Sequence, residues 1–138
     1  MAKNTQPLPD VTRHETQPFW EGCRRGELMI QRCASCRTWI WYPQDVCHVC
    51  NAKDLGWERV SGKGKVFSWV LSRQALHPWF ADKLPLIVAL VELDDAPGVR
   101  FTTNILDCTP EQVKLGMPVS VVFQKINDQI TLPYFKRA

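Results

Sequence analysis

The stretches Cys33-Ala-Ser-Cys36 and Cys47-His-Val-Cys50 decide the fold of the first half of the chain. A C-x-x-C pair on a tight turn directs two thiolates to one side, and two such pairs complete a tetrahedron of sulfur ligands that suits zinc. The connector is shorter than the roughly 15 to 20 residues of the usual pattern. It still allows a short hairpin, because residues 39–42 favour a strand and Pro43 ends it. The sequence therefore predicts a four-cysteine zinc site, and an iron site of rubredoxin type would use the same ligands.

The predicted zinc is structural. Four thiolates fill a tetrahedral shell and leave no position for a reactive water. His48 lies inside the second pair, and we expect it to be an exposed spacer rather than a ligand. A redox-active C-x-x-C pair is not favoured, because no thioredoxin-like βαβ pattern surrounds either pair.

Composition places the chain among ordinary globular proteins. It has 138 residues, 45% of them apolar and 22% charged, which fits one compact domain or a domain with a small appendage. The formal net charge of +3 is too mild to indicate nucleic acid or a membrane surface. No apolar run reaches the roughly 18 residues of a membrane helix. The polar residues 1–10 lack a signal-peptide core, so we expect a reducing, cytoplasmic location.

Three parts are expected along the chain. Residues 1–15 lack periodicity and are predicted to be a mobile arm. Residues 16–56 are predicted to hold a short helix, over residues 16–25, and the zinc ribbon. The boundary is placed near Gly56, and residues 57–138 form a β-rich part. Gly26 is a suitable helix end.

The β-rich part contains five predicted strands, over residues 66–72, 86–93, 99–106, 119–123 and 129–135. A capping box beginning at Thr109 predicts a helix of two turns or less between the third and fourth strands. Asn127-Asp128 is a candidate two-residue hairpin turn before the fifth strand. Alternation in the first strand assigns Phe67 and Trp69 to the barrel interior. This order predicts an OB-fold, with an SH3-like barrel as the competing fold.

Several short motifs, in this order, resemble one known family. They are Phe19-Trp20-Glu21-Gly22, Gly26-Glu27-Leu28, the two cysteine pairs, Gly62-Lys63-Gly64-Lys65-Val66-Phe67-Ser68-Trp69, Val91-Glu92-Leu93, Gly116-Met117-Pro118-Val119 and Leu132-Pro133-Tyr134-Phe135. Together they are similar to the acyl-CoA-associated zinc-ribbon/OB-fold proteins known as domain of unknown function thirty-five. The resemblance runs from about Phe19 to Phe135. It differs at residues 42–45, where a Pro-Pro-Arg type segment is common, so the chain lacks that arginine.

The resemblance implies a non-catalytic accessory subunit of an enzyme that acts on CoA thioesters. Members of the family accompany thiolases, thiolase-like aldolases or hydroxymethylglutaryl-CoA synthase, and often lie beside the CoA entrance. The residues agree with this expectation, because Cys23 and Cys108, which lie outside the two pairs, have no obvious histidine partner nearby in the sequence. A partner enzyme would then supply the catalytic groups.

The charge distribution is compatible with two kinds of ligand. Residues 57–73 form a basic stripe that meets either the phosphates of CoA or single-stranded nucleic acid. By charge alone, Lys63, Lys65 and Arg73 are the candidates for contact with CoA phosphates. A nucleic-acid-binding ribbon/OB module is the alternative function, and it is not favoured because the stripe is short and its aromatic residues are expected to face inward.

An aromatic surplus beyond the expected core predicts a protein interface. An aromatic surplus beyond what a small barrel can bury is typical of a binding surface. The candidates are Phe19, Trp20, Trp79, Phe80, Tyr134 and Phe135. Packing of Trp20 and Phe135 onto the protein's own core is the alternative for these residues.

Overall fold

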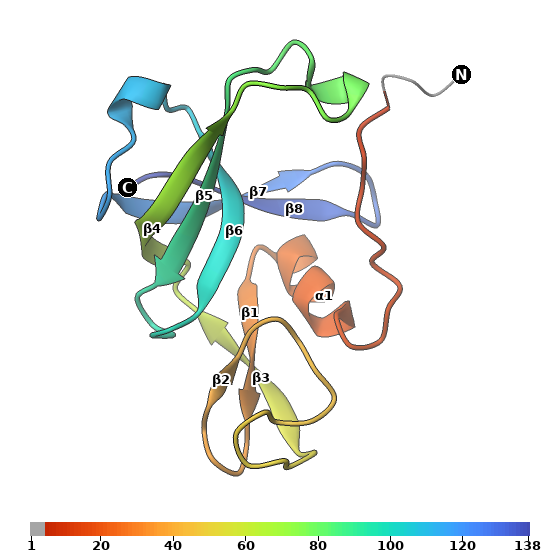
Figure 1. Cartoon of the computed structure of the whole chain (residues 1–138). Coiled ribbons are helices and arrows are strands. Elements are labelled where there is room, and N and C mark those ends of the chain that lie inside the picture. Colours follow the sequence, from red (N-terminus) through yellow and green to blue (C-terminus); the bar gives the residue numbers. More distant parts are fainter. Residues whose placement is uncertain (1–4) are drawn as a thin grey trace.

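Strands make up most of the described chain, residues 5–138, in this computed structural model (Figure 1). The elements are α1 (Gln17–Arg25), β1 (Leu28–Cys33), β2 (Trp39–Ile40), β3 (Leu55–Val60), β4 (Lys63–Ser72), the 3₁₀-helix η1 (Pro78–Phe80), β5 (Leu86–Leu93), β6 (Arg100–Leu106), the 3₁₀-helix η2 (Pro110–Gln112), β7 (Pro118–Lys125) and β8 (Thr131–Arg137). Among residues 5–138, no helix has the length and apolar character needed to span a membrane. The predicted mobile arm begins with four residues that lie outside the described part.

Helix α1 ends at Gly26, as its sequence predicts. Gly26 has a φ of 76°, and its N–H donates to the Cys23 carbonyl at 3.0 Å. This left-handed conformation is one that glycine adopts readily. The buried face of α1 contains Phe19, Gly22 and Cys23. A Cβ at Gly22 would lie 2.5 Å from Met29 Cγ, so the glycine allows α1 to pack closely against β1.

A three-stranded sheet in the order β2-β1-β3 carries the ribbon. Strand β3 pairs antiparallel with β1 along its whole length, from Cys33 opposite Leu55 to Leu28 opposite Val60. Strand β3 therefore crosses the boundary expected near Gly56, and its residues 57–60 are bonded to the ribbon sheet rather than to the barrel.

The second sheet is a closed five-stranded barrel in the order β4-β5-β6-β8-β7. All its neighbouring strands are antiparallel except β6 and β8, which run parallel and pair only at Ile105–Phe135 and Leu106–Lys136. The OB-fold prediction is confirmed, and the SH3-like alternative is set aside.

The expectation that Phe67 lies inside the barrel is wrong. Phe67 is 47% exposed, whereas its neighbour Val66 is 1% exposed. The pairing of β4 with β5 shifts register between Val66 and Ser68, which is a β-bulge. A bulge adds one residue to a strand and reverses which alternating side chains face inward. Past the bulge, Trp69 is partly buried against the core, as its expected position requires.

One connection agrees with its sequence prediction and one differs. The short helix predicted after Thr109 is the single 3₁₀ turn η2, and its predicted capping box is present: Gln112 Oε1 accepts from the Thr109 N–H at 2.9 Å. The turn between β7 and β8 spans residues 126–130 rather than two residues. Its Asn127 Oδ1 accepts from the N–H groups of Gln129 and Ile130, both at 2.8 Å. A side chain that bonds the backbone two and three residues ahead stabilises this wider loop.

Aromatic side chains join the ribbon to the barrel. Trp41 stacks on Phe101 of β6, with ring centroids 4.9 Å apart, and Phe19 of α1 lies 5.3 Å from Trp41. Phe101 also contacts Phe135 of β8 at 5.8 Å. Each such pair contributes about 0.5–1.5 kcal/mol beyond the area it buries. One continuous core therefore runs from α1 through the ribbon connector into the barrel.

Candidate metal centre

The two cysteine pairs adopt the same backbone conformation. In each pair, the carbonyl of the first cysteine accepts a hydrogen bond from the N–H four residues later. The N–H of the same cysteine donates to the carbonyl five residues later. The bonds are Arg37 N–H to Cys33 O (3.0 Å), Cys33 N–H to Thr38 O (3.0 Å), Asn51 N–H to Cys47 O (3.0 Å) and Cys47 N–H to Ala52 O (2.9 Å). The residues after each pair, Arg37 and Asn51, have φ values of 64° and 63°. This left-handed residue closes each turn and brings its two sulfur atoms to one side.

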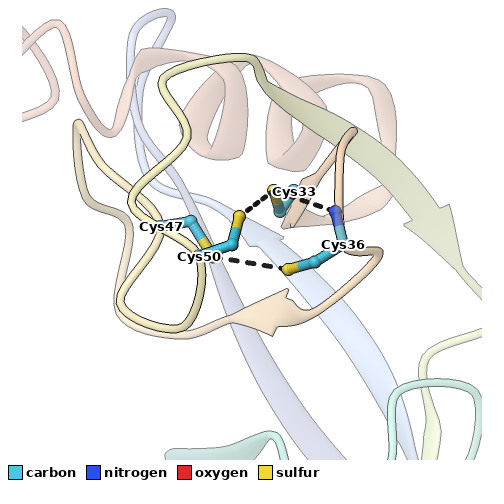
Figure 2. A group of neighbouring side chains, drawn as sticks. All are labelled: Cys33, Cys36, Cys47 and Cys50. Atoms are coloured by element: carbon cyan, nitrogen blue, oxygen red, sulfur yellow. Dashed lines mark hydrogen bonds between the residues drawn. The ribbon is translucent and has the colours of Figure 1, made fainter.

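The four predicted ligands come together (Figure 2). Their Sγ atoms all lie within 4.8 Å of one another, and Cys33–Cys50 and Cys36–Cys47 are each 3.6 Å apart. A tetrahedron with Zn–S bonds of about 2.3 Å has sulfur atoms about 3.8 Å apart. The arrangement thus fits a zinc ion with four thiolate ligands. Cys33 and Cys47 are buried while Cys36 and Cys50 are exposed, so the site lies at the edge of the ribbon.

Hydrogen-bond donors lie close to three of the four ligand sulfur atoms. The Val49 N–H points to Cys47 Sγ at 3.4 Å, and the Cys36 N–H points to Cys33 Sγ at 3.5 Å. The Thr38 hydroxyl lies 3.0 Å from Cys36 Sγ, and hydrogen bonds with Thr38 are the main cause that lowers the pKa of Cys36 to about 6. The thiolate is the form that binds metal. The site can hold an ion and tie the two turns together, and a full thiolate shell leaves no position for substrate.

Two arginines beside the site pair with one carboxylate. Arg32 and Arg37 lie 3.1 Å and 2.5 Å from the Glu58 carboxylate. Arg37 is the main cause of a lowered pKa at Glu58, followed by Arg32. These ion pairs join the first cysteine turn to β3. They also neutralise the two arginines, whose charge would otherwise offset the negative charge of the thiolates. Within the part of the chain that the structure describes, His48 is not among the clustered ligands, as expected.

The candidates for contact with CoA do not form one cluster. Lys63 and Lys65 are exposed on the same side of β4. Arg73 follows the other end of that strand, roughly 25 Å of extended chain away from Lys65. Lys65 also lines a cavity of about 470 Å³ together with Glu92 and Asp94, which reduces its positive field. Contact of CoA with Lys63 and Lys65 stays a prediction, and Arg73 is not placed beside them.

The predicted interface residues separate into two groups. Phe19 and Phe135 are only 4% and 0% exposed, so they lie in the core and present no surface to a partner. Both residues are buried because they belong to the aromatic cluster that joins the ribbon to the barrel, so they are removed from the predicted interface. The other four candidates, Trp20, Trp79, Phe80 and Tyr134, are partly exposed. Phe67 also faces outward, and the Arg100 guanidinium lies 3.8 Å from the centre of its ring.

Sequence reasoning missed the role of Trp41 and Phe101. The sequence predicts Trp41 only as part of a ribbon strand, but β2 ends at Ile40 and the indole reaches the barrel. The signal in the sequence was an aromatic run, residues 39–42, that is longer than the two-residue strand it contains.

A rubredoxin-like zinc ribbon joined to an OB-fold barrel defines the class of this protein. Two family models match it: "ChsH2, rubredoxin-like zinc ribbon domain" over residues 20–56 and "ChsH2, C-terminal OB-fold domain" over residues 57–124. A DUF35 domain-containing scaffold protein of Methanocaldococcus jannaschii is 36% identical over 102 residues, which cover 73% of this chain and 70% of that protein. The chain therefore belongs to the DUF35 family of zinc-ribbon/OB-fold proteins.

Two further relatives are named for enzymes. A probable enoyl-CoA hydratase alpha subunit of Thermomonospora curvata is 34% identical over 137 residues. The match covers 99% of this chain, and the chain spans only 41% of that relative's length. Among solved structures, one titled "Ltp2-ChsH2(DUF35) aldolase" has a TM-score of 0.82 and 30% identity, and the match covers 94% of this chain and 98% of that chain.

Proposed function

We propose that this chain is a non-catalytic accessory subunit that binds and supports an enzyme acting on CoA thioesters. The observation that carries the proposal is the match, over nearly the full length of both chains, to the structure titled as an Ltp2-ChsH2(DUF35) aldolase. The relatives named as a hydratase subunit and as a scaffold protein support the same role.

The chemistry of the described residues supports a non-catalytic role. The zinc ligands form a closed thiolate shell, which serves structure rather than reaction. Burial raises the pKa of Cys23 to about 12, so this thiol is protonated at neutral pH. Cys108 is partly exposed, and its thiol donates to the Thr109 carbonyl at 3.6 Å rather than to a base. The partner would supply the nucleophile and the acid–base groups.

The names of the relatives, an aldolase and a probable enoyl-CoA hydratase subunit, support an aldolase or a hydratase as the class of partner. A thiolase-like or hydroxymethylglutaryl-CoA-synthase-like partner is the wider prediction from the family. Lys63 and Lys65 are the proposed contacts to the phosphates of CoA. A reducing compartment such as the cytoplasm would keep the metal-binding thiols available.

The loop between β4 and β5 is the proposed partner surface. It carries Leu76, which is 88% exposed, and the edge-to-face pair of Trp79 and Phe80, whose ring centroids are 5.0 Å apart. Lys83 lies over the Trp79 ring at 3.7 Å. Exposed apolar and aromatic side chains gathered on one loop are typical of interface centres.

Co-expression with the CoA-thioester enzyme of the neighbouring gene tests the proposal. We expect the two chains to elute together on size exclusion. Replacing Leu76 by Asp should weaken the complex by about tenfold or more, because it places a charge in an apolar contact. The matched control is Leu115→Asp, since Leu115 is 70% exposed and lies near Lys65, at the other end of β4. Separate elution of the two wild-type chains would contradict the proposed function.

A further inference from the structure

Strand β5 is apolar on both of its faces. Every second residue from Ile87 to Leu93 is buried in the barrel core, and none of them is more than 4% exposed. Three of the other residues, Leu86, Val88 and Leu90, point away from the core and are partly exposed. A strand face that meets water is usually polar, whereas a strand that is covered on both sides is apolar throughout. The sequence of β5 therefore fits a strand whose outer face is also covered.

The neighbouring strand β4 extends this outer face. Val70 of β4 lies opposite Val88 and is 61% exposed. Residues that are directly opposite in an antiparallel pair point to the same side of the sheet. The β-bulge in β4 turns Phe67 outward as well, and its ring reaches the Arg100 guanidinium of β6, 3.8 Å away. Because β5 lies between β4 and β6, this contact crosses the outer face of β5.

The same face continues into the loop between β4 and β5. A cavity of about 180 Å³ is lined by Leu86 and Val88 of β5 and by Leu76 and Phe80 of the loop. Strands β4, β5 and β6 lie side by side, and helix α1 packs mainly on β1 and β8 instead (Figure 1). The residues that we call the outer apolar face are Phe67, Val70, Leu86, Val88 and Leu90. This face and the loop form one continuous surface.

Basic side chains border the outer apolar face at both ends. The charged residues around it include Lys63, Lys65, Arg73, Glu92, Asp94 and Arg100. Lys63 and Lys65 are exposed at one end of β4, and Arg73 follows its other end. Glu92 is paired with Arg100 at 3.4 Å. Among these six, only Asp94 remains to offset the three other basic groups, so the border has an excess of positive charge.

This charge pattern does not suit a second copy of the same chain. Two outer apolar faces packed against each other would place the lysine end of one β4 beside either the lysine end or Arg73 of the other copy, whichever way the strands run. Both arrangements bring like charges together, which opposes association. A surface with acidic side chains at both ends would complement the face instead.

We propose that the outer apolar face binds the partner enzyme, at a part of the enzyme's surface that has an apolar centre and acidic side chains on either side. The inference rests on the proposed function for the identity of the partner. It extends the contact from the loop of Leu76 across the sheet, so that Val70 lies near the centre of the interface, where most of the binding energy of a complex is found. The partner then covers the outward side chains of β5.

Replacing Val70 by Asp in the zinc-loaded full chain tests the apolar part of the inference. The change places a charge at the centre of the face, at a position exposed enough to leave the barrel intact. We expect the dissociation constant of the complex with the enzyme of the neighbouring gene, measured by isothermal titration calorimetry, to rise about tenfold or more. Val70→Ile keeps an apolar, β-branched side chain and should bind as wild type. Both variants should keep the circular dichroism spectrum of the wild-type fold.

Charge reversal at one end of the face tests the acidic part. Arg73→Glu should weaken the complex about threefold or more at low salt, because it replaces an attraction by a repulsion. The matched control is Lys125→Glu, since Lys125 is exposed at the end of β7 that lies away from its pairing with β4. This control should bind as wild type. Raising the salt concentration from about 50 to 500 mM should weaken the wild-type complex more than the Arg73→Glu complex.

Hydroxyl-radical footprinting of the wild-type complex locates the contact without any substitution. The side chains of Val70 and Leu76 should be protected when the enzyme binds, while Leu115 should be labelled as in the free chain. If Val70 stays labelled in the complex, or if Val70→Asp or Arg73→Glu binds as tightly as wild type, the inference is overturned and the proposed function stands.

Two other results bear on the occupant of the face. A wild-type chain that forms a dimer on its own, which Val70→Asp splits into monomers, would assign the face to a second copy and overturn the inference. Failure of the wild-type chain to bind the enzyme at all would contradict the proposed function, and the inference with it.

Discussion

The six cysteines differ in reactivity because their surroundings differ. Cys33, Cys36, Cys47 and Cys50 share one site and become thiolates bound to metal. Cys23 lies in the core between α1 and the sheet, where burial raises the pKa of its thiol to about 12. Cys108 is partly exposed at the end of β6 and takes no part in the metal site.

These differences predict the pattern of alkylation by iodoacetamide. With zinc bound, mass spectrometry should find Cys108 modified and Cys23 unmodified, because only a thiolate with solvent access reacts. Adding a strong chelator should expose the four ligand thiols to modification, while Cys23 stays protected as long as the barrel is folded. Modification of the ligand cysteines at the rate of Cys108 before chelation would contradict the metal assignment.

Strand β4 is the element where close backbone contact matters most. Gly64 faces β5, and a Cβ added there would lie 2.6 Å from the Glu92 carbonyl oxygen and 2.7 Å from Val91 Cγ1. The backbone oxygen cannot move without disturbing the pairing of the strands. Gly64 therefore allows β4 to approach β5 closely where the two strands pair.

Replacing Gly64 by Ala should lower the free energy of unfolding by about 1–3 kcal/mol, the usual cost of overpacking. The control is Gly56→Ala in β3, where a Cβ would meet only the Arg32 carbonyl at 3.8 Å. That change should be neutral within about 0.5 kcal/mol. Urea denaturation of both variants measures the difference, and equal midpoints for the two would show that β4 and β5 can separate at no cost.

The ribbon depends on metal more than the barrel does. Its sheet has three strands, one of them only two residues long, and its own buried cluster is Cys33, Ile40 and Cys47. A core this small needs a metal to hold it. The barrel has a much larger set of buried apolar residues.

Replacing Cys47 by Ser should loosen the ribbon and leave the barrel folded. In hydrogen exchange, amides of residues 33–56 should lose most of their protection, while those of β5 and β7 keep theirs. The control Cys108→Ser removes a thiol outside the site and should leave exchange unchanged. Uniform loss of protection in the barrel would mean that the two parts unfold as one unit.

The sequence predicts local features better than long-range ones. The zinc ligands are set by spacing within one short segment, and the barrel strands are predicted from short alternating or continuous apolar runs. The bulge at Phe67 could not be predicted, because it is defined by the pairing of β4 with Leu90 and Val91 of β5, which lie far along the chain. Likewise, Trp41 meets Phe101 only after the whole chain folds. The burial of Phe19 and Phe135 follows from that same contact.

Across the whole molecule, aromatic contacts hold the ribbon, the helix and the barrel together as one unit. Trp20 and Tyr134 line a groove of about 400 Å³ beside these aromatic contacts, and the loop with Trp79 and Phe80 extends from the barrel. In the proposed function, such surfaces support the active site of another enzyme.

The turnover of an acyl-CoA substrate measures the proposed accessory role in three samples: the chain alone, its partner enzyme alone, and an equimolar mixture. We expect no turnover by the chain, low activity or rapid loss of activity for the partner, and higher, stable activity for the mixture. The Leu76→Asp chain should restore less activity than the Leu115→Asp chain at the same concentration. Turnover by the chain alone, or full and stable activity of the partner without it, would contradict the accessory role.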